Sequence, residues 1–167
     1  MKDASSLDFK QNYPSFPEFA RHGIPLNLVS AELILCLQQI RDKTGIPIYP
    51  SPLPSAWART DGSQTSRHYA VNRLSDAGDV FPDRGRFLEL YLHLQQVSDI
   101  GGIGIYADTN GPDGEPWPMI HFDLRPVNLR VFWARDGKYC SLAKDPAGYA
   151  RVLAKIIEME ADNGYMG

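Results

Sequence analysis

The segment 119–124 restricts the possible fold more than any other stretch of this sequence. Apolar and polar residues alternate along it, and this period of two is the pattern of a β-strand. Its apolar side chains then point to one face of a sheet, while His121 and Asp123 point together to the other. The chain is therefore expected to build a sheet with one face in a core and a polar pair on the opposite face.

Two further candidate metal ligands lie upstream of this strand. His68 ends the segment Ser66-Arg67-His68, and Asp79 follows it by eleven positions. Two imidazoles and one carboxylate suit Zn²⁺, fill three tetrahedral positions and leave the fourth for water, whose pKa then falls to about 7. We therefore predict a zinc site from His68, Asp79 and His121, with Asp76 as the alternative to Asp79. His22 is a weaker candidate, because an isolated histidine more often packs or faces solvent.

Hydrophobic periodicity predicts a mixture of helices and strands. The predicted helices are 25–43, 86–97 and 145–160, and the predicted strands are 46–49, one ending at 80–82, 101–106, 119–124 and 129–133. Because strands and helices do not strictly alternate, we expect an α+β domain with an antiparallel sheet and helices packed on it. At 167 residues the chain fits one domain, at 25–167, preceded by an aperiodic N-terminal arm at 1–24.

Composition excludes several classes of protein. Hydrophobic residues make up 43%, charged residues 22%, and the net charge is -3, so the basic excess typical of nucleic-acid binding is missing. No apolar run approaches the roughly 18 to 20 residues that span a bilayer, and no apolar targeting segment follows Met1, so we expect a cytoplasmic chain without a membrane anchor. Cys36 and Cys140 have neither disulfide-framework density nor CxxC spacing and are expected to be incidental thiols.

Five motifs occur in an order that is typical of one known family. They are Gly45-Ile46-Pro47-Ile48, Ser55-Ala56-Trp57-Ala58-Arg59-Thr60, Ser66-Arg67-His68 with Ala77-Gly78-Asp79-Val80, Gly102-Ile103-Gly104-Ile105-Tyr106, and His121-Phe122-Asp123-Leu124-Arg125. This order resembles zinc peptidases related to bacterial D-alanyl-D-alanine carboxypeptidases, phage peptidoglycan endopeptidases and the hedgehog signalling domain. The resemblance covers about residues 24 to 135 and implies the hedgehog/DD-peptidase-like fold.

The resemblance also implies roles for individual residues. His68, Asp79 and His121 correspond to the zinc ligands, and Arg59 lies where relatives hold a substrate carboxylate, which a guanidinium grips with two parallel hydrogen bonds. The usual spacing from the first histidine to the aspartate is seven, so the spacing of eleven here implies a four-residue insertion. Asp79 is preferred over Asp76, because the family's flanking residues stand next to Asp79.

The general base departs from the family pattern. Many relatives carry it three residues before the last histidine, where this chain has Pro118. Glu115 lies six residues before His121, a spacing that the hedgehog branch resembles, and is our prediction for the base; the other interpretation is a solvated loop glutamate. Asp123 is expected to be a catalytic-site residue that orients a ligand or Arg59.

The resulting hypothesis is a zinc-dependent peptidase whose substrate is a peptidoglycan stem peptide or cross-link. The absence of a targeting segment favours a phage lysin, which waits in the cytoplasm before release to the wall. The alternative is a non-catalytic zinc-bearing binding or structural module on the same scaffold, and Pro118 at the expected base position keeps this alternative open.

Overall fold

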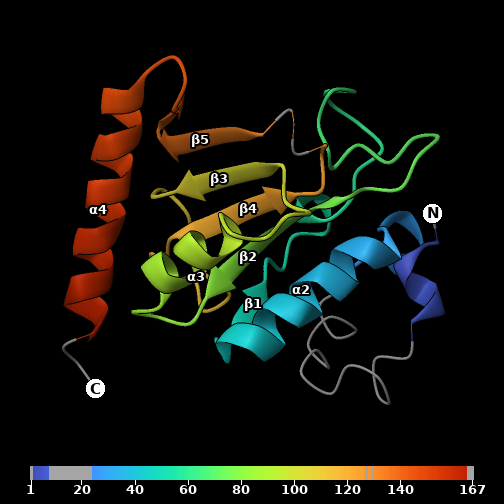
Figure 1. Cartoon of the computed structure of the whole chain (residues 1–167), viewed down its shortest axis with the longest axis horizontal. Helices are drawn as coiled ribbons and strands as arrows, with labels where there is room; N and C mark the ends of the chain where they lie inside the picture. The colour runs from blue at the N-terminus through green and yellow to red at the C-terminus, as the bar shows by residue number, and fades with distance from the viewer. Residues whose placement is uncertain (1, 8–23, 127, 129, 165–167) are drawn as a thin grey trace.

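The computed structural model describes residues 2–7, 24–126, 128 and 130–164. His22 and most of the predicted arm 1–24 lie outside the described residues. The strands are β1 (Ile48–Pro50), β2 (Ala77–Pro82), β3 (Gly102–Tyr106), β4 (Met119–Asp123), β5 (Val131–Asp136) and β6 (Lys138–Ser141). The α-helices are α2 (Ala31–Thr44), α3 (Phe87–Leu94) and α4 (Pro146–Gly164), and short 3₁₀ turns occur at Ala4–Ser6, Leu26–Leu28 and Pro54–Ala56 (Figure 1).

The strands form one six-stranded sheet in the order β1-β2-β4-β3-β5-β6. Helices and sheet together confirm the α+β class. The prediction of an antiparallel sheet holds for four of the five strand pairs and is wrong for one, because β3 and β5 are parallel.

The parallel pair has a simple topological cause. β4 lies between β2 and β3, so β3 keeps one free edge, and β5 joins the sheet there. Asp123 at the end of β4 and Val131 at the start of β5 both pair with Gly102, so the two strand ends that flank the connection lie at the same end of the sheet. β5 therefore runs in the direction of β3. Arg130 holds this connection, since its guanidinium donates hydrogen bonds to the carbonyl oxygens of Gln95, Val97 and Ile100.

Helix α2 begins later than its periodicity predicts. Ser30 has an extended backbone, and its hydroxyl accepts a hydrogen bond from the Leu33 amide at 3.1 Å, which makes it the N-cap. Residues 26–28, predicted as the first turn of the helix, form a separate 3₁₀ turn. The predicted end is confirmed, because Gly45 closes the helix in the left-handed conformation at φ 66°.

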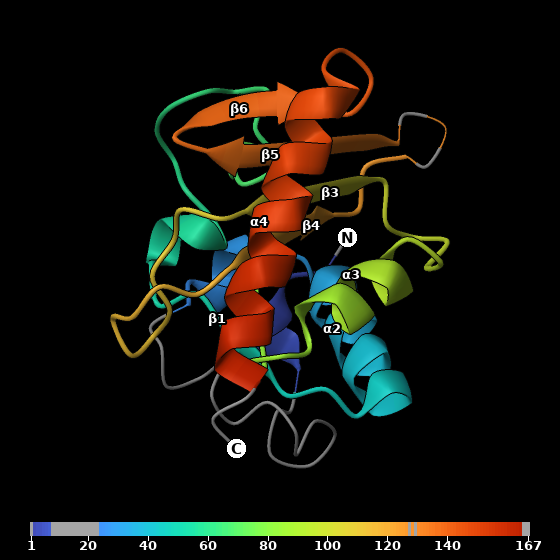
Figure 2. The same ribbon diagram turned by 90° about the vertical axis from the view of Figure 1, so that its left-hand side faces the viewer.

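The two faces of the sheet have different partners. Val80, Ile103, Ile105, Ile120 and Phe122 are fully buried and belong to the main core, together with apolar side chains of α2, α3 and α4. In Figure 2, α4 crosses in front of β5 and β3, and it packs against both strands and β6. The helices thus cover one face, which leaves the opposite face of the sheet for the polar residues.

That opposite face carries a smaller cluster formed by Phe81, Tyr106, Trp117 and Met119. The described part of the chain contains no helix long and apolar enough to cross a bilayer.

Candidate metal centre

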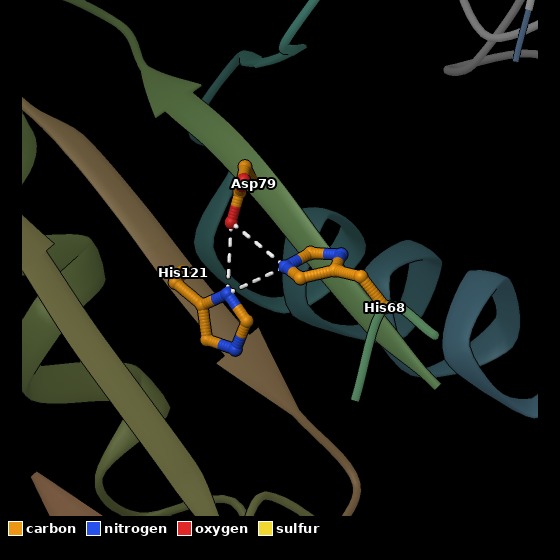
Figure 3. A group of neighbouring side chains, drawn as sticks. All are labelled: His68, Asp79 and His121. Atoms are coloured by element: carbon orange, nitrogen blue, oxygen red, sulfur yellow. Dashed lines mark hydrogen bonds and ion pairs between the residues drawn. The ribbon is translucent and has the colours of Figure 1, made fainter. Parts of the chain in front are cut away.

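Three predicted ligands meet on the open face of the sheet. His121 Nδ1 lies 2.8 Å from Asp79 Oδ1 and 3.0 Å from His68 Nε2, and His68 Nε2 lies 3.5 Å from Asp79 Oδ1 (Figure 3). The three side chains come from β4, β2 and the loop before β2, and they point toward one another. Asp79 keeps some exposure, whereas both histidines are buried.

This triangle fits a tetrahedral metal ion. Zinc bonds of about 2.0 Å at tetrahedral angles place two ligand atoms about 3.3 Å apart. The observed separations of 2.8, 3.0 and 3.5 Å lie around that value. A small contraction or expansion of the triangle is therefore enough to bind an ion, and the group can hold a metal.

Sheet register brings Asp79 and His121 together. Asp79 on β2 pairs directly with His121 on β4, so their side chains project from the same face of neighbouring strands. His68 needs a different explanation, because it lies on a loop. Its carbonyl oxygen accepts the Arg59 amide at 2.8 Å, and the Ala70 amide donates to the Arg59 carbonyl at 2.8 Å. This backbone ladder holds the two halves of the loop side by side.

Trp57 anchors the same loop in the core. It is fully buried, and its indole N–H donates to the Ser51 carbonyl oxygen at 3.2 Å. A Cβ on Gly78 would come within 2.5 Å of the Trp57 ring, so only glycine lets the indole approach β2 this closely. The position of His68 thus depends on a tryptophan and a glycine distant from it in sequence.

Asp123 lies behind His121. Its Oδ2 is 3.2 Å from His121 Nε2, and it is also paired in a forked arrangement with the Arg125 guanidinium. A metal-binding histidine usually donates its other ring N–H to such an acceptor, which fixes the tautomer and the ring orientation. Asp123 is fully buried, and a Cβ on Gly102 would lie 2.3 Å from its carboxylate, so β3 must have glycine there. His68 has no such support, since its Nδ1 is buried without a hydrogen-bond partner among the described residues.

The charges in this cluster stabilise one another. Burial by itself would lower the pKa of His121, but hydrogen bonds with Asp123 and Asp79 raise its pKa to about 9. Burial opposes ionisation of Asp79, yet attraction to His68 and hydrogen bonds with both imidazoles bring the pKa of Asp79 well below its ordinary range. Without a metal, the cluster therefore favours an ionised Asp79 beside a protonated His121.

A cavity of about 610 Å³ opens over the cluster and includes His68, Asp79 and His121 in its lining. This volume lies within the range of small-molecule and peptide sites. The loop 51–68 forms one part of its wall, and Phe81, Tyr106, Met119 and Trp133 line it from the sheet. The three candidate ligands thus lie in the wall of a cavity large enough for a small molecule.

The predicted substrate-binding residue Arg59 lines this cavity. Its Nε is buried without a hydrogen-bond partner among the described residues, and no described carboxylate forms an ion pair with it. A guanidinium in this situation favours an anionic ligand.

The structure does not bring Glu115 or Asp76 into the centre. Glu115 is exposed and is not among the residues that line the cavity, although Thr109 and Asn110 of the same loop line it. Its position therefore gives no support to the prediction that it is the general base. Asp76 is buried in an ion pair with Arg67. The residue that joins the two histidines is Asp79.

Sequence reasoning overlooked Trp133 and two arginines of the cavity, Arg125 and Arg135. The Trp133 ring lies 4.8 Å from the His121 ring, and its indole N–H donates to the Tyr106 hydroxyl at 3.1 Å. The motif Gly102-Ile103-Gly104 was the available signal, because glycines at alternate positions leave a strip of one strand face without side chains.

Comparisons of this chain with models of protein families, with curated proteins and with solved structures found no match. The geometry of the centre and the chemistry of its residues are therefore the basis for a function.

Proposed function

We propose that this chain is a zinc-dependent peptidase that hydrolyses stem peptides or cross-links of peptidoglycan, as a lysin of the carboxypeptidase or endopeptidase type. The observation that carries the proposal is the convergence of His68 Nε2, Asp79 Oδ1 and His121 Nδ1 in the lining of a cavity of about 610 Å³. Zinc held there would supply a Lewis acid and a water molecule acidic enough to ionise near neutral pH.

The protein's own residues then have distinct tasks. Arg59 binds a carboxylate of the peptide, since its charge has no described partner and it faces the same cavity. Asp123 accepts a hydrogen bond from His121 Nε2–H, and this tautomer leaves the Nδ1 lone pair free to bind metal. Trp133 and Tyr106 line the side of the cavity next to His121 and exclude water from it.

One observation favours a second candidate, a zinc-bearing binding module without hydrolytic activity. Among the described residues that line the cavity, the ligand Asp79 is the sole carboxylate, so no separate acidic side chain is in place as a general base. A peptidase of this design relies on the acidified water alone or on a group delivered by the substrate.

Digestion of purified peptidoglycan distinguishes the two candidates. If the chain is a peptidase, it should release soluble wall peptides, which mass spectrometry detects. This release should stop when a chelator is added and resume when zinc is restored. His68→Ala is the inactive control, and Lys155→Gln, in an exposed ion pair on α4, is the control for a mutation outside the cavity. A parent protein that holds zinc and releases no peptide would establish the binding module instead.

A further inference from the structure

Positively charged side chains outnumber negatively charged ones among the described residues that line the cavity. Arg59, Arg67, Arg125 and Arg135 all line it, against the carboxylate of Asp79. Three of the four form an ion pair with a carboxylate that does not itself line the cavity. Arg67 pairs with Asp76, Arg125 with Asp123 and Arg135 with Asp108.

These three ion pairs differ in how much of each guanidinium they occupy. Arg67 and Arg125 each use Nε and Nη2 in a forked pair with their carboxylates. Arg135 donates to Asp108 through Nε alone, at 2.9 Å. Arg135 therefore keeps more of its five donors for an additional acceptor than the other two arginines do, although the Tyr139 hydroxyl also lies within hydrogen-bond reach of its guanidinium.

Arg135 is also held in place before any ligand arrives. Its guanidinium carbon lies 5.0 Å from the centre of the Tyr106 ring and 5.7 Å from that of the Tyr139 ring. Asp108, which orients it, is itself fixed by the Gly137 amide at 2.9 Å. The side chain keeps 31% of its surface exposed, so it remains accessible at the cavity rim. A preorganised arginine loses little conformational entropy when it binds an anion.

Arg59 and Arg135 reach the cavity from different elements of the fold. Arg59 belongs to the loop that follows the edge strand β1, while Arg135 lies on β5, next to the other edge strand β6. The metal ligands on β2 and β4 lie between these edges. On β3, Gly104 pairs with His121 of β4. Tyr106, two residues further along β3, pairs with Arg135 of β5.

This register sets the length of peptide that reaches Arg135. Two strand spacings of about 4.8 Å and a shift of two residues place the Cα atoms of Arg135 and His121 roughly 12 Å apart. An extended peptide advances about 3.3 to 3.6 Å per residue. A group bound by Arg135 therefore belongs to a residue roughly three or four positions from the bond next to the metal.

We propose that Arg135 forms a second anion subsite, so that the substrate is a peptide with a free carboxylate roughly three or four residues from the bond to be cut, in addition to the carboxylate held by Arg59. This inference rests on the proposed peptidase function for the identity of the ligand as a peptide. The subsite itself depends on Arg135, Asp108 and the two tyrosines, and can be tested without hydrolysis.

The test measures binding of paired peptides by calorimetry with the chelator-treated protein, in which hydrolysis cannot interfere. Each pair consists of two acetylated peptides with a free C-terminus that differ only in carrying Glu or Gln at one position. This position is moved stepwise along the peptide from one pair to the next. We expect the parent to bind the Glu peptide at least about tenfold more tightly at one of these positions. Arg135→Gln should bring the ratio close to one, and Lys155→Gln, which also removes one paired positive charge outside the cavity, should retain it.

Either of two results would overturn the subsite. One is a parent protein that binds Glu and Gln peptides equally at every position, a measurement that needs no variant. The other is a folded Arg135→Gln protein that keeps the full ratio. Digestion of the same peptides by the zinc-loaded parent is followed separately. A preserved Glu preference without any cleavage would support the subsite and contradict the peptidase, which separates the two proposals.

Discussion

The indole of Trp133 lies against the imidazole of His121 although their strands are not neighbours. The ring centres are 4.8 Å apart, and β3 lies between β4 and β5. His121, Gly104 and Trp133 occupy one row of the register, and a Cβ on Gly104 would lie 2.4 Å from the Trp133 ring. The absence of a side chain on β3 lets the tryptophan reach across it and form a wall for the metal ligand.

Substitution of Gly104 by alanine should therefore disturb the metal centre. The added methyl group overlaps the indole and costs about 1 to 3 kcal/mol of unfolding free energy, as overpacking usually does. Trp133→Ala removes the clash, so Gly104→Ala should cost clearly less in that background. Denaturant unfolding of the parent, the two single variants and the double variant measures this difference. Equal costs in both backgrounds would contradict the packing argument.

Zinc binding should depend on Asp79 and not on Asp76. Asp79→Asn removes a ligand and should abolish stoichiometric zinc binding, as should His68→Ala and His121→Ala. Asp76→Asn breaks the ion pair with Arg67 and should lower stability while the zinc content stays near one per chain. Metal analysis of purified proteins, with thermal unfolding as the control for folding, gives the answer. Full zinc occupancy in Asp79→Asn would remove Asp79 from the site.

Asp123→Asn should weaken zinc binding without abolishing it. The substitution keeps the size of the side chain but takes away the charge that orients His121 and pairs with Arg125. Loss of such a partner usually lowers metal affinity by about 10- to 100-fold. Competition with a zinc chelator measures the change. Asp136→Asn, in an exposed ion pair with Lys155, is the matched control, and an equal effect in both variants would argue against a specific role for Asp123.

Arg59→Lys should lower kcat/KM for wall peptides while zinc content stays unchanged. Lysine keeps the charge but loses the forked geometry with which a guanidinium binds a carboxylate, and we expect a loss of about tenfold or more. Arg151→Lys, on the exposed side of α4, should leave the rate as it is. Unaltered hydrolysis in Arg59→Lys would show that this arginine does not contact substrate.

Glu115→Gln tests a point on which sequence and structure give different expectations. A general base contributes roughly 10² to 10⁴-fold to the rate, and the spacing to His121 had suggested that role. The exposed position outside the cavity lining predicts an unchanged rate instead. Peptide hydrolysis by the zinc-loaded variant decides between them, and a loss of 10²-fold or more would show that the loop 107–117 closes over the centre during catalysis.

Much of the fold was predictable because its signals are local. Alternation along 119–124 placed His121 and Asp123 on one face of a strand, and β4 (Met119–Asp123) has that arrangement. Gly45 ends α2 through its left-handed backbone, as predicted, whereas the periodicity missed the N-cap at Ser30 that begins the helix. The candidate ligands could be predicted for the same reason, because the ability of an imidazole or a carboxylate to bind a metal is a property of the single residue.

The tertiary structure alone decided which distant segments became neighbours. Period-two alternation says which face a side chain takes but not which strand lies beside it, so the parallel pairing of β3 with β5 and the contact of Trp133 with His121 had no local signal. Glu115 was placed by sequence spacing, whereas its real position depends on the path of a loop. The pairing of Arg135 with Asp108 and its place in the cavity likewise arise from contacts across the sheet, where energies depend on proximity in space rather than along the chain.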